Sequence, residues 1–425
     1  MKSWKEYLEE RLHIGSIPVP RSAECRHFLI LGRSGTGKTR LIYSFLEKLR
    51  KRKDSIVIIY DFKGDYVSCF YESGDLLFNP LDTRTIHWCP LSEIHAISDI
   101  DSIATSLIPP SRGDDKFWVD GARDVLASLA YIVFTRFGTS NTELFNLTSL
   151  NERETLGVVT QAVNEGVEYA KRAVGYLEQG QEKGAKVAGD ILATMRQYTN
   201  CFFYMRHLRS EFSISEFLSS SSGKILFLVG FPKLRDTLRP LFSLFVDLFI
   251  KAVLSLPEDN ERRIFLVLDE FATLQRLTSI VQGLEQGRSK GMGIVIALQD
   301  INQLRRIYQD DTANSIVNNC SAVVTFALND PASQEYMSKL YGEFEKLETD
   351  ESLSMGPQDL RDGLTLKRQR RVERLILPSE FGSLPDLTCY LKMLDFPVSR
   401  VRIPCVAREA KVPPLVFDER FLISN

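Results

Sequence analysis

Short runs of apolar residues recur in two parts of the chain, before residue 95 and after residue 218, each bounded by polar residues or glycine. These runs lack the strict alternation of a half-exposed strand, so they are typical of parallel strands that are covered on both faces. They predict seven buried strands, at residues 27–31, 55–61, 75–79, 224–230, 264–270, 293–299 and 322–328.

Segments with helical spacing of apolar residues separate most of these strands. The helices that this spacing predicts cover residues 38–51, 238–256, 274–290 and 312–318. Because strands and helices alternate, the pattern favours an open α/β fold with a mainly parallel, twisted sheet that is flanked by helices.

The alternation stops between residues 91 and 220, where helical spacing dominates. The helices predicted there cover residues 97–108, 116–137, 152–163, 170–177 and 183–198. A helical block between two parts of one sheet indicates an inserted all-α domain. The expected units are a lead-in, residues 1–25, an α/β domain made of residues 26–95 and 218–425, and an all-α domain, residues 96–217.

Two further segments have a clear pattern. Residues 241–256 are rich in leucine, phenylalanine and valine, but Ser243, Asp247 and Lys251 place a polar stripe along one helical face. This segment is also shorter than the 20 or so apolar residues of a membrane span, so a buried amphipathic helix is predicted. Residues 343–371 are polar and charged, and a surface loop is predicted there.

Composition excludes some classes of protein. The 53 lysines and arginines nearly balance the 55 aspartates and glutamates, so DNA would have to bind a local patch, a pore or a ring interior. The seven cysteines form no C-x-x-C pair, which argues against a metal site or a disulfide framework and favours a reducing, cytoplasmic compartment. No signal peptide is visible at the N-terminus.

Residues 32–39 carry the most informative motif, Gly-Arg-Ser-Gly-Thr-Gly-Lys-Thr, between a predicted strand and a predicted helix. In this context the pattern indicates a site for a nucleoside triphosphate, ATP. Lys38 can reach the β- and γ-phosphates, and Thr39 offers a hydroxyl group to Mg²⁺. The residues expected to bind the nucleotide are Gly32, Ser34, Gly35, Thr36, Gly37, Lys38, Thr39 and Arg40.

Two carboxylates end the strand predicted at residues 264–270. Ligands of open α/β sheets bind at the carboxyl ends of the strands, where Asp269 and Glu270 would lie. Asp269 is expected to support Mg²⁺, and Glu270 to polarise the water that attacks the γ-phosphate.

Two other polar residues have candidate catalytic roles. Gln299 ends the next strand, so its amide is expected beside Asp269 and Glu270, where it could contact the γ-phosphate or position water. Arg288 follows the Asp269 strand by one helix and faces away from its own nucleotide. It could act on a neighbouring subunit as an arginine finger, or it could only complete the dipole of its helix.

Three further features have both a functional and a structural explanation. Asp61 follows the second predicted strand and either tunes the Mg²⁺ region or caps a turn. The basic run at residues 367–371 either contacts phosphates or belongs to a solvated hairpin. Phe117 and Trp118 begin a predicted helix, where core packing is favoured over stacking on bases.

The order of several motifs resembles the conjugative coupling proteins of type IV secretion systems, the TraD/TrwB group. The resemblance covers most of the chain. It rests on the lead-in at residues 14–21, Asp61-Phe62-Lys63-Gly64-Asp65, residues 78–82, Leu268-Asp269-Glu270-Phe271, residues 287–291, Ala297-Leu298-Gln299-Asp300, and residues 377–381 and 384–387.

The resemblance implies a RecA-like nucleotide-binding domain, a membrane-distal all-α domain and a hexameric ring with ATP sites between subunits. It also implies DNA-stimulated ATP hydrolysis that moves single-stranded DNA, with an attached relaxase, toward the secretion channel. Arg288 would be the finger acting in trans, and Gln299 the γ-phosphate sensor. Family members usually carry transmembrane helices before the lead-in. Only about a dozen residues precede it here, so either that segment is missing from this sequence or the chain is a soluble relative. The chain is expected in the cytoplasm or peripheral to the inner membrane, where a segment outside this sequence could attach it.

Two other functions fit the same motifs. One is an intracellular motor for double-stranded DNA, as in FtsK- and HerA-like proteins. The other is a recruitment hub in which the all-α domain binds substrate proteins and nucleotide only controls assembly.

Overall fold

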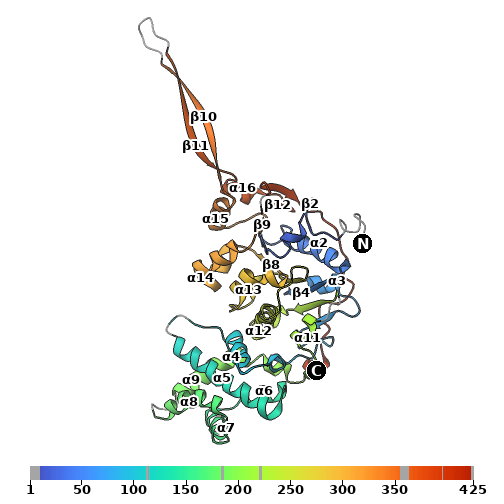
Figure 1. Ribbon diagram of the computed structural model, residues 1–425, viewed down its shortest axis with the longest axis vertical. Helices are drawn as coiled ribbons and strands as arrows, with labels where there is room; N and C mark the ends of the chain where they lie inside the picture. The colour runs from blue at the N-terminus through green and yellow to red at the C-terminus, as the bar shows by residue number, and fades with distance from the viewer. Residues whose placement is uncertain are drawn as a thin grey trace.

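A nine-stranded sheet forms the centre of the protein (Figure 1). The computed structural model describes residues 10–111, 113, 115–182, 186–219, 223–354, 363–394 and 396–422. The strand order is β13-β12-β9-β3-β8-β7-β4-β6-β5, and the seven strands from β9 to β5 are parallel. The strands are β3 (Phe28–Leu31), β4 (Ser55–Asp61), β5 (Leu76–Phe78), β6 (Ile225–Val229), β7 (Arg263–Leu268), β8 (Met292–Leu298), β9 (Ala322–Thr325), β12 (Thr388–Met393) and β13 (Ser399–Arg402).

All seven apolar runs become strands β3 to β9, which confirms the predicted parallel sheet. Strand β3 shows why these runs lack alternation. Phe28 and Ile30 belong to one hydrophobic core, whereas Leu29 and Leu31 belong to a second core on the other face. Since both faces are covered, every residue of the strand is apolar.

Helices cover both faces of the sheet (Figure 1). One core contains Leu41 and Phe45 of helix α2, and the other contains Phe245 of helix α12. The helices of this part are α2 (Lys38–Lys51), α3 (Asp65–Phe70), α12 (Arg235–Leu254), α13 (Ile280–Gln286), α14 (Ile301–Asn318), α15 (Pro331–Tyr341) and α16 (Pro378–Ser383).

Two helix predictions need correction. The helix expected at residues 274–290 begins only at Ile280, because residues before it bond to α12 instead: the Gln275 N–H donates to Ser243 Oγ and the Ser279 hydroxyl to Asp247. Helix α14 starts well before residue 312, at Ile301, where Asp300 caps it, and it is interrupted at Gln309 (φ 62°).

The buried helix predicted at residues 241–256 is confirmed as part of α12. Its polar stripe finds polar partners: Asp247 accepts a hydrogen bond from Ser106, and Lys251 donates to the same hydroxyl. Among the described residues, no helix combines the length and the apolar character that crossing a membrane requires.

The segment between β5 and β6 is helical and lies at one end of the molecule (Figure 1). Its helices are α4 (Ile97–Leu107), α5 (Lys116–Phe137), α6 (Asn141–Thr148), α7 (Glu152–Asn164), α8 (Lys171–Glu182), α9 (Lys186–Thr199), α10 (Phe202–Met205) and α11 (Ile214–Ser219). The expectation that Phe117 is a core residue is wrong, since Phe117 is 43% exposed and packs against Trp118 and Tyr176.

A long two-stranded ribbon replaces the predicted surface loop at residues 343–371. Strand β10 (Glu343–Ser354) pairs antiparallel with β11 (Gly363–Arg374), and the ribbon projects from the end opposite the helices (Figure 1). Cross-strand ion pairs stabilise it, among them Arg371–Glu348 at 3.5 Å. The basic run therefore lies in a hairpin.

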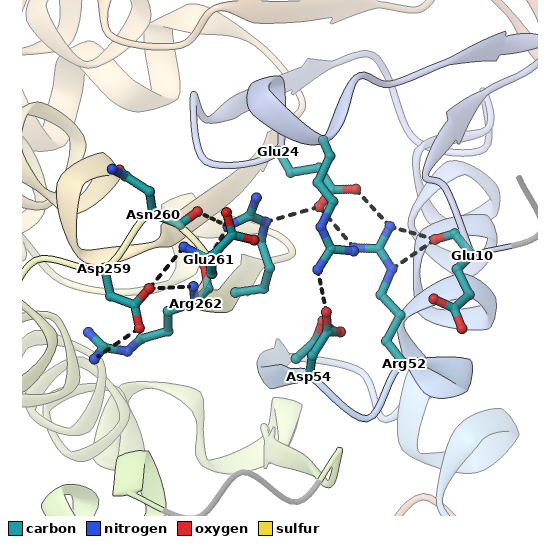
Figure 2. A network of polar contacts seen from close by, with 11 residues as sticks. Glu10, Glu24, Arg52, Asp54, Asp259, Asn260, Glu261 and Arg262 are labelled. Atoms are coloured by element: carbon teal, nitrogen blue, oxygen red, sulfur yellow. Dashed lines mark hydrogen bonds and ion pairs between the residues drawn. The ribbon is translucent and has the colours of Figure 1, made fainter. Parts of the chain in front are cut away.

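A buried ionic network joins the strands at their amino ends (Figure 2). Glu24, which is fully buried, accepts two hydrogen bonds from Arg52, at 2.7 and 2.9 Å. Arg263, at the start of β7, lies 3.5 Å from the same carboxylate. The network ties the lead-in to the starts of β4 and β7.

Candidate nucleotide site

The glycine loop lies between β3 and α2, as the motif predicts. Gly35 and Gly37 have φ angles of 84° and 124°, which residues with a side chain rarely adopt. A Cβ at Gly37 would also lie 3.1 Å from both Leu387 and Phe326. The loop is further tightened by Thr36, whose hydroxyl donates to the Arg33 carbonyl at 2.8 Å. Only glycine fits position 37.

Lys38 is buried at the base of this loop. Its ammonium group donates to the carbonyls of Gly32 (2.5 Å) and Arg33 (3.1 Å). Burial lowers its pKa, while the nearby carboxylates of Glu270 and Asp269 act in the opposite direction. The lysine is therefore held at the loop, within the field of both acidic residues.

Tyr66 contacts Asp269 and lies near Thr39, the two residues predicted to hold the metal. Its hydroxyl donates to Asp269 Oδ2 at 2.9 Å. Burial raises the pKa of Tyr66 well above its usual value, whereas the nearby Thr39 side chain lowers it. Burial raises the pKa of Asp269, whereas the Tyr66 hydrogen bond lowers it. No sequence pattern predicted a role for Tyr66; its one signal is its position beside the Asp61-Phe62-Lys63-Gly64-Asp65 motif.

Glu270 and Gln299 are in direct contact. The amide of Gln299 donates to Glu270 Oε1 at 2.5 Å, as the neighbouring positions of β7 and β8 predict. Glu270 has a left-handed backbone (φ 53°, ψ 48°), a strained conformation that is common at functional sites. In this conformation the carboxylate lies against Gln299, at the end of β8.

The other predicted loop residues divide into two sets. Ser34 and Gly35 form the exposed tip, whereas Gly32 and Thr36 are buried. Arg40 does not turn toward the loop: it donates to the Val406 carbonyl at 2.9 Å and lies over the ring of Tyr43. The structure thus gives Arg40 a link to the C-terminal segment.

Asp61 caps a turn, one of the two roles left open. Its carboxylate accepts hydrogen bonds from the backbone N–H groups of Gly64, Tyr66 and Val67 at 2.8–2.9 Å. Burial raises its pKa to about 7. Because both oxygens are used at the start of α3, Asp61 contributes by fixing Tyr66.

Arg288 lies at the opposite end of the sheet from Gln299. It belongs to the short turn η6 (Gly287–Lys290) before β8, so the seven residues of β8, about 23 Å, separate the two. Its side chain is exposed, and backbone bonds hold its turn, among them one from Asp259 N to Ser289 O at 3.0 Å. Arg288 cannot reach the Lys38 loop of its own chain.

The site can hold a phosphate chain and one Mg²⁺. Among the described residues no group of three or more His, Cys, Asp or Glu residues could hold a metal ion. Mg²⁺ at nucleotide sites needs no such cage, because it is bound by one or two protein oxygens together with phosphates and water. Thr39 and Asp269, which both lie near Tyr66, fit this requirement.

Comparisons with known proteins agree with this geometry. The Coupling protein TraD of Escherichia coli (strain K12) is 27% identical over 421 residues. The match covers 97% of this chain and 57% of that protein, so the chain spans little more than half of TraD's length.

Solved structures of one coupling protein match the whole fold. TrwB in complex with the ATP analogue ADPNP has a TM-score of 0.82 and 26% identity, covering 98% of this chain and 96% of that chain. TrwB with ADP and Mg²⁺ has a TM-score of 0.79 and 28% identity, covering 96% and 91%. The RecA-like fold class is confirmed.

A family model described as the type IV secretion-system coupling protein DNA-binding domain matches residues 11–404. This match includes the glycine loop, both acidic residues, the helical segment and the ribbon. The chain therefore belongs to the family of type IV secretion-system coupling proteins.

Proposed function

We propose that this chain is an ATPase that moves single-stranded DNA, with an attached relaxase, toward a type IV secretion channel. The observation that carries the proposal is the convergence of four residues at the carboxyl ends of neighbouring strands: Lys38, Asp269, Glu270 and Gln299. The TrwB complexes with ADPNP and with ADP and Mg²⁺ support ATP and Mg²⁺ as the ligands.

Each residue has one role in the proposed site. Lys38 binds the β- and γ-phosphates, and Thr39 and Asp269 hold Mg²⁺, which when bound neutralises phosphate charge. Glu270 accepts a proton from the attacking water, and Gln299 fixes the orientation of the Glu270 carboxylate through their hydrogen bond.

The position of Arg288 supports a ring of subunits, a hexamer in this proposal. An exposed arginine about 23 Å from its own Gln299 can serve catalysis only in a neighbouring site. In a closed ring the interface is heterologous, so each subunit presents its glycine loop to one neighbour and its Arg288 turn to the other. The proposed transfer of DNA also requires two kinds of partner, the relaxase and the channel proteins at the inner membrane.

Comparison of single- and double-stranded DNA tests this proposal. Single-stranded DNA is expected to raise the rate of ATP hydrolysis more than double-stranded DNA does. Stimulation by double-stranded DNA alone would favour a duplex motor instead. Relaxase binding that persists in a Glu270→Gln variant, together with unchanged DNA transfer, would favour the recruitment hub.

A further inference from the structure

A cavity of about 410 Å³ adjoins Glu270 and Gln299, which form part of its wall. Cationic side chains enter this cavity from three separate elements, and we call it the three-cation cleft. The cations are Lys63 after β4, Arg235 at the start of α12 and Arg306 in α14. The remaining lining residues are Phe62, Ala272, Thr273, Gln303 and Ile307.

The three cations lack anionic partners. All are exposed, and within the described part of the chain none has a carboxylate oxygen within 4.0 Å. Their neighbours differ: Arg305 pairs with Asp310 at 3.0 Å, and Arg239 donates to the Leu274 carbonyl. Glu270 is the only acidic residue among the described residues that line the cavity, so the three cations outnumber it and the lining carries a net positive charge that attracts a further anion.

The chemistry of the lining fits a nucleic-acid strand. The guanidinium of Arg235 lies 5.6 Å from the centre of the Phe62 ring, so a cation and an aromatic face occur together. Grooves that bind single strands combine such cations with aromatic rings and need no base-specific contacts. Lys63 also lies near the nucleotide site. Burial lowers the pKa of Lys38, Glu270 and Asp269 raise it, and the charge of Lys63 lowers it further.

Strained backbone occurs both at the catalytic residue Glu270 and in α14, the helix that supplies Arg306 to the cleft. Glu270 has a φ of 53°, and Gln309, which interrupts α14 three residues beyond Arg306, has a φ of 62°. The rings of Phe271 and Tyr308 stack at 5.7 Å, so the first part of α14 packs on the residue that follows Glu270. A ligand that moves this part of α14 would therefore act on Glu270.

We propose that the three-cation cleft binds backbone phosphates of single-stranded DNA, which places the strand against the wall that carries Glu270 and Gln299. This inference rests on the proposed DNA-translocating function and adds to it the surface of each subunit that the strand contacts. Arg235 and Arg306 hold the phosphates, and the occupied cleft sets the position of α14 next to the hydrolytic residue.

The test is the affinity for a fluorescein-labelled oligothymidylate, followed by anisotropy without nucleotide over a series of salt concentrations. The double variant Arg235→Gln/Arg306→Gln should bind about tenfold more weakly, and the slope of log Kd against log salt should fall by about 1.4, at about 0.7 for each phosphate contact. Arg235→Lys/Arg306→Lys keeps both charges and should keep the slope.

The matched control removes two charges elsewhere. Arg153 in α7 and Arg209 after α10 are both exposed, and Arg153→Gln/Arg209→Gln should bind DNA like the unmodified chain. If the cleft and control variants lose the same amount of DNA affinity, the loss comes from the lower net charge alone, and the assignment is overturned.

Two more results would overturn the assignment. One is an unchanged affinity and slope in the cleft variant, which would leave the DNA function standing without this site. The other is weaker binding of a fluorescent ATP analogue with unchanged DNA binding, which would assign the cleft to the nucleotide. If the unmodified chain binds no DNA, the proposed function fails and the cleft assignment fails with it.

Discussion

The hydroxyl of Tyr66 donates a hydrogen bond of 2.9 Å to Oδ2 of Asp269 and so joins the start of α3 to the end of β7. The Thr39 side chain, next to Lys38 at the start of α2, lies near the same phenol group. The phenol group thus holds Asp269, one of the two residues proposed to bind Mg²⁺, and lies beside the other, Thr39. Asp61 supports this arrangement, because its carboxylate accepts the Tyr66 backbone N–H at 2.9 Å.

Replacement of Tyr66 by phenylalanine tests this link. Tyr66→Phe keeps the ring but removes one hydrogen bond to a carboxylate, which contributes about 1.5 kcal/mol. We expect the apparent Mg²⁺ affinity in ATP hydrolysis to fall about tenfold, whereas ADP binding without Mg²⁺ stays unchanged. Tyr43→Phe is the control, since the Tyr43 hydroxyl donates to the Asp65 carbonyl. An unchanged Mg²⁺ dependence in Tyr66→Phe would contradict the role of Tyr66.

Arg288→Ala should abolish hydrolysis without abolishing ATP binding. An arginine that stabilises the transition-state charge contributes about 10³-fold or more to the rate, and Arg288 is too far from its own site to act there. Mixed with Lys38→Ala subunits, the variant should recover part of its turnover, because the Lys38→Ala subunit supplies the missing arginine. The absence of any recovery in mixtures that do assemble would count against a role in trans.

Because His27 is buried, we predict that the protein loses stability in acid. Nδ1 of this buried ring accepts the Ile294 N–H at 3.1 Å, and burial lowers its pKa to about 4 from the usual 6.5. Between pH 6.5 and 4, His27 is therefore protonated in the unfolded chain but remains neutral in the folded chain. The stabilisation is complete above pH 6.5 and is lost as the pH falls toward 4, by about 3 kcal/mol.

Urea unfolding above pH 6.5 and near pH 4 measures this loss in the unmodified chain and in His27→Asn. Asparagine keeps an acceptor, tolerates the φ of 59° and does not titrate, so its unfolding free energy should change less with pH. Parallel pH profiles of the two proteins would show that His27 is not the acid-sensitive group.

The buried Glu24 carboxylate predicts a large effect on stability. Glu24→Gln leaves the buried guanidinium of Arg52 without its counter-charge, and we expect the free energy of unfolding to fall by about 3–5 kcal/mol. Glu211→Gln, at an exposed pair 4.0 Å from Arg209, should change it by about 0.5 kcal/mol or less. Equal effects of the two substitutions would mean that the network of Figure 2 contributes little to stability.

The sequence was sufficient for the parallel sheet and for much of the site. Its apolar runs have both faces buried, and the strand ends necessarily bring Glu270 and Gln299 together. It was insufficient where partners are distant in the chain. The ribbon of β10 and β11 depends on pairing such as Glu343 with Arg374, and a charged strand resembles a loop until its partner is known.

The same limit applies to side chains around the site. Arg40 belongs to the loop motif, but it bonds to Val406, a contact across 366 positions that no local pattern indicates. Arg235 and Arg306 are separated by two strands and a helix, so only the folded chain brings them to one cavity.

The most direct test of the proposed function is the rate of ATP hydrolysis with and without single-stranded DNA, measured in the unmodified chain and in Glu270→Gln. Glu270→Gln keeps the size of the side chain but removes its basicity. We predict that DNA stimulates hydrolysis by the unmodified chain, and that Glu270→Gln binds ATP and DNA but does not turn over. Full turnover in Glu270→Gln, or no response of the unmodified chain to DNA, would contradict a DNA-dependent ATPase built on this site.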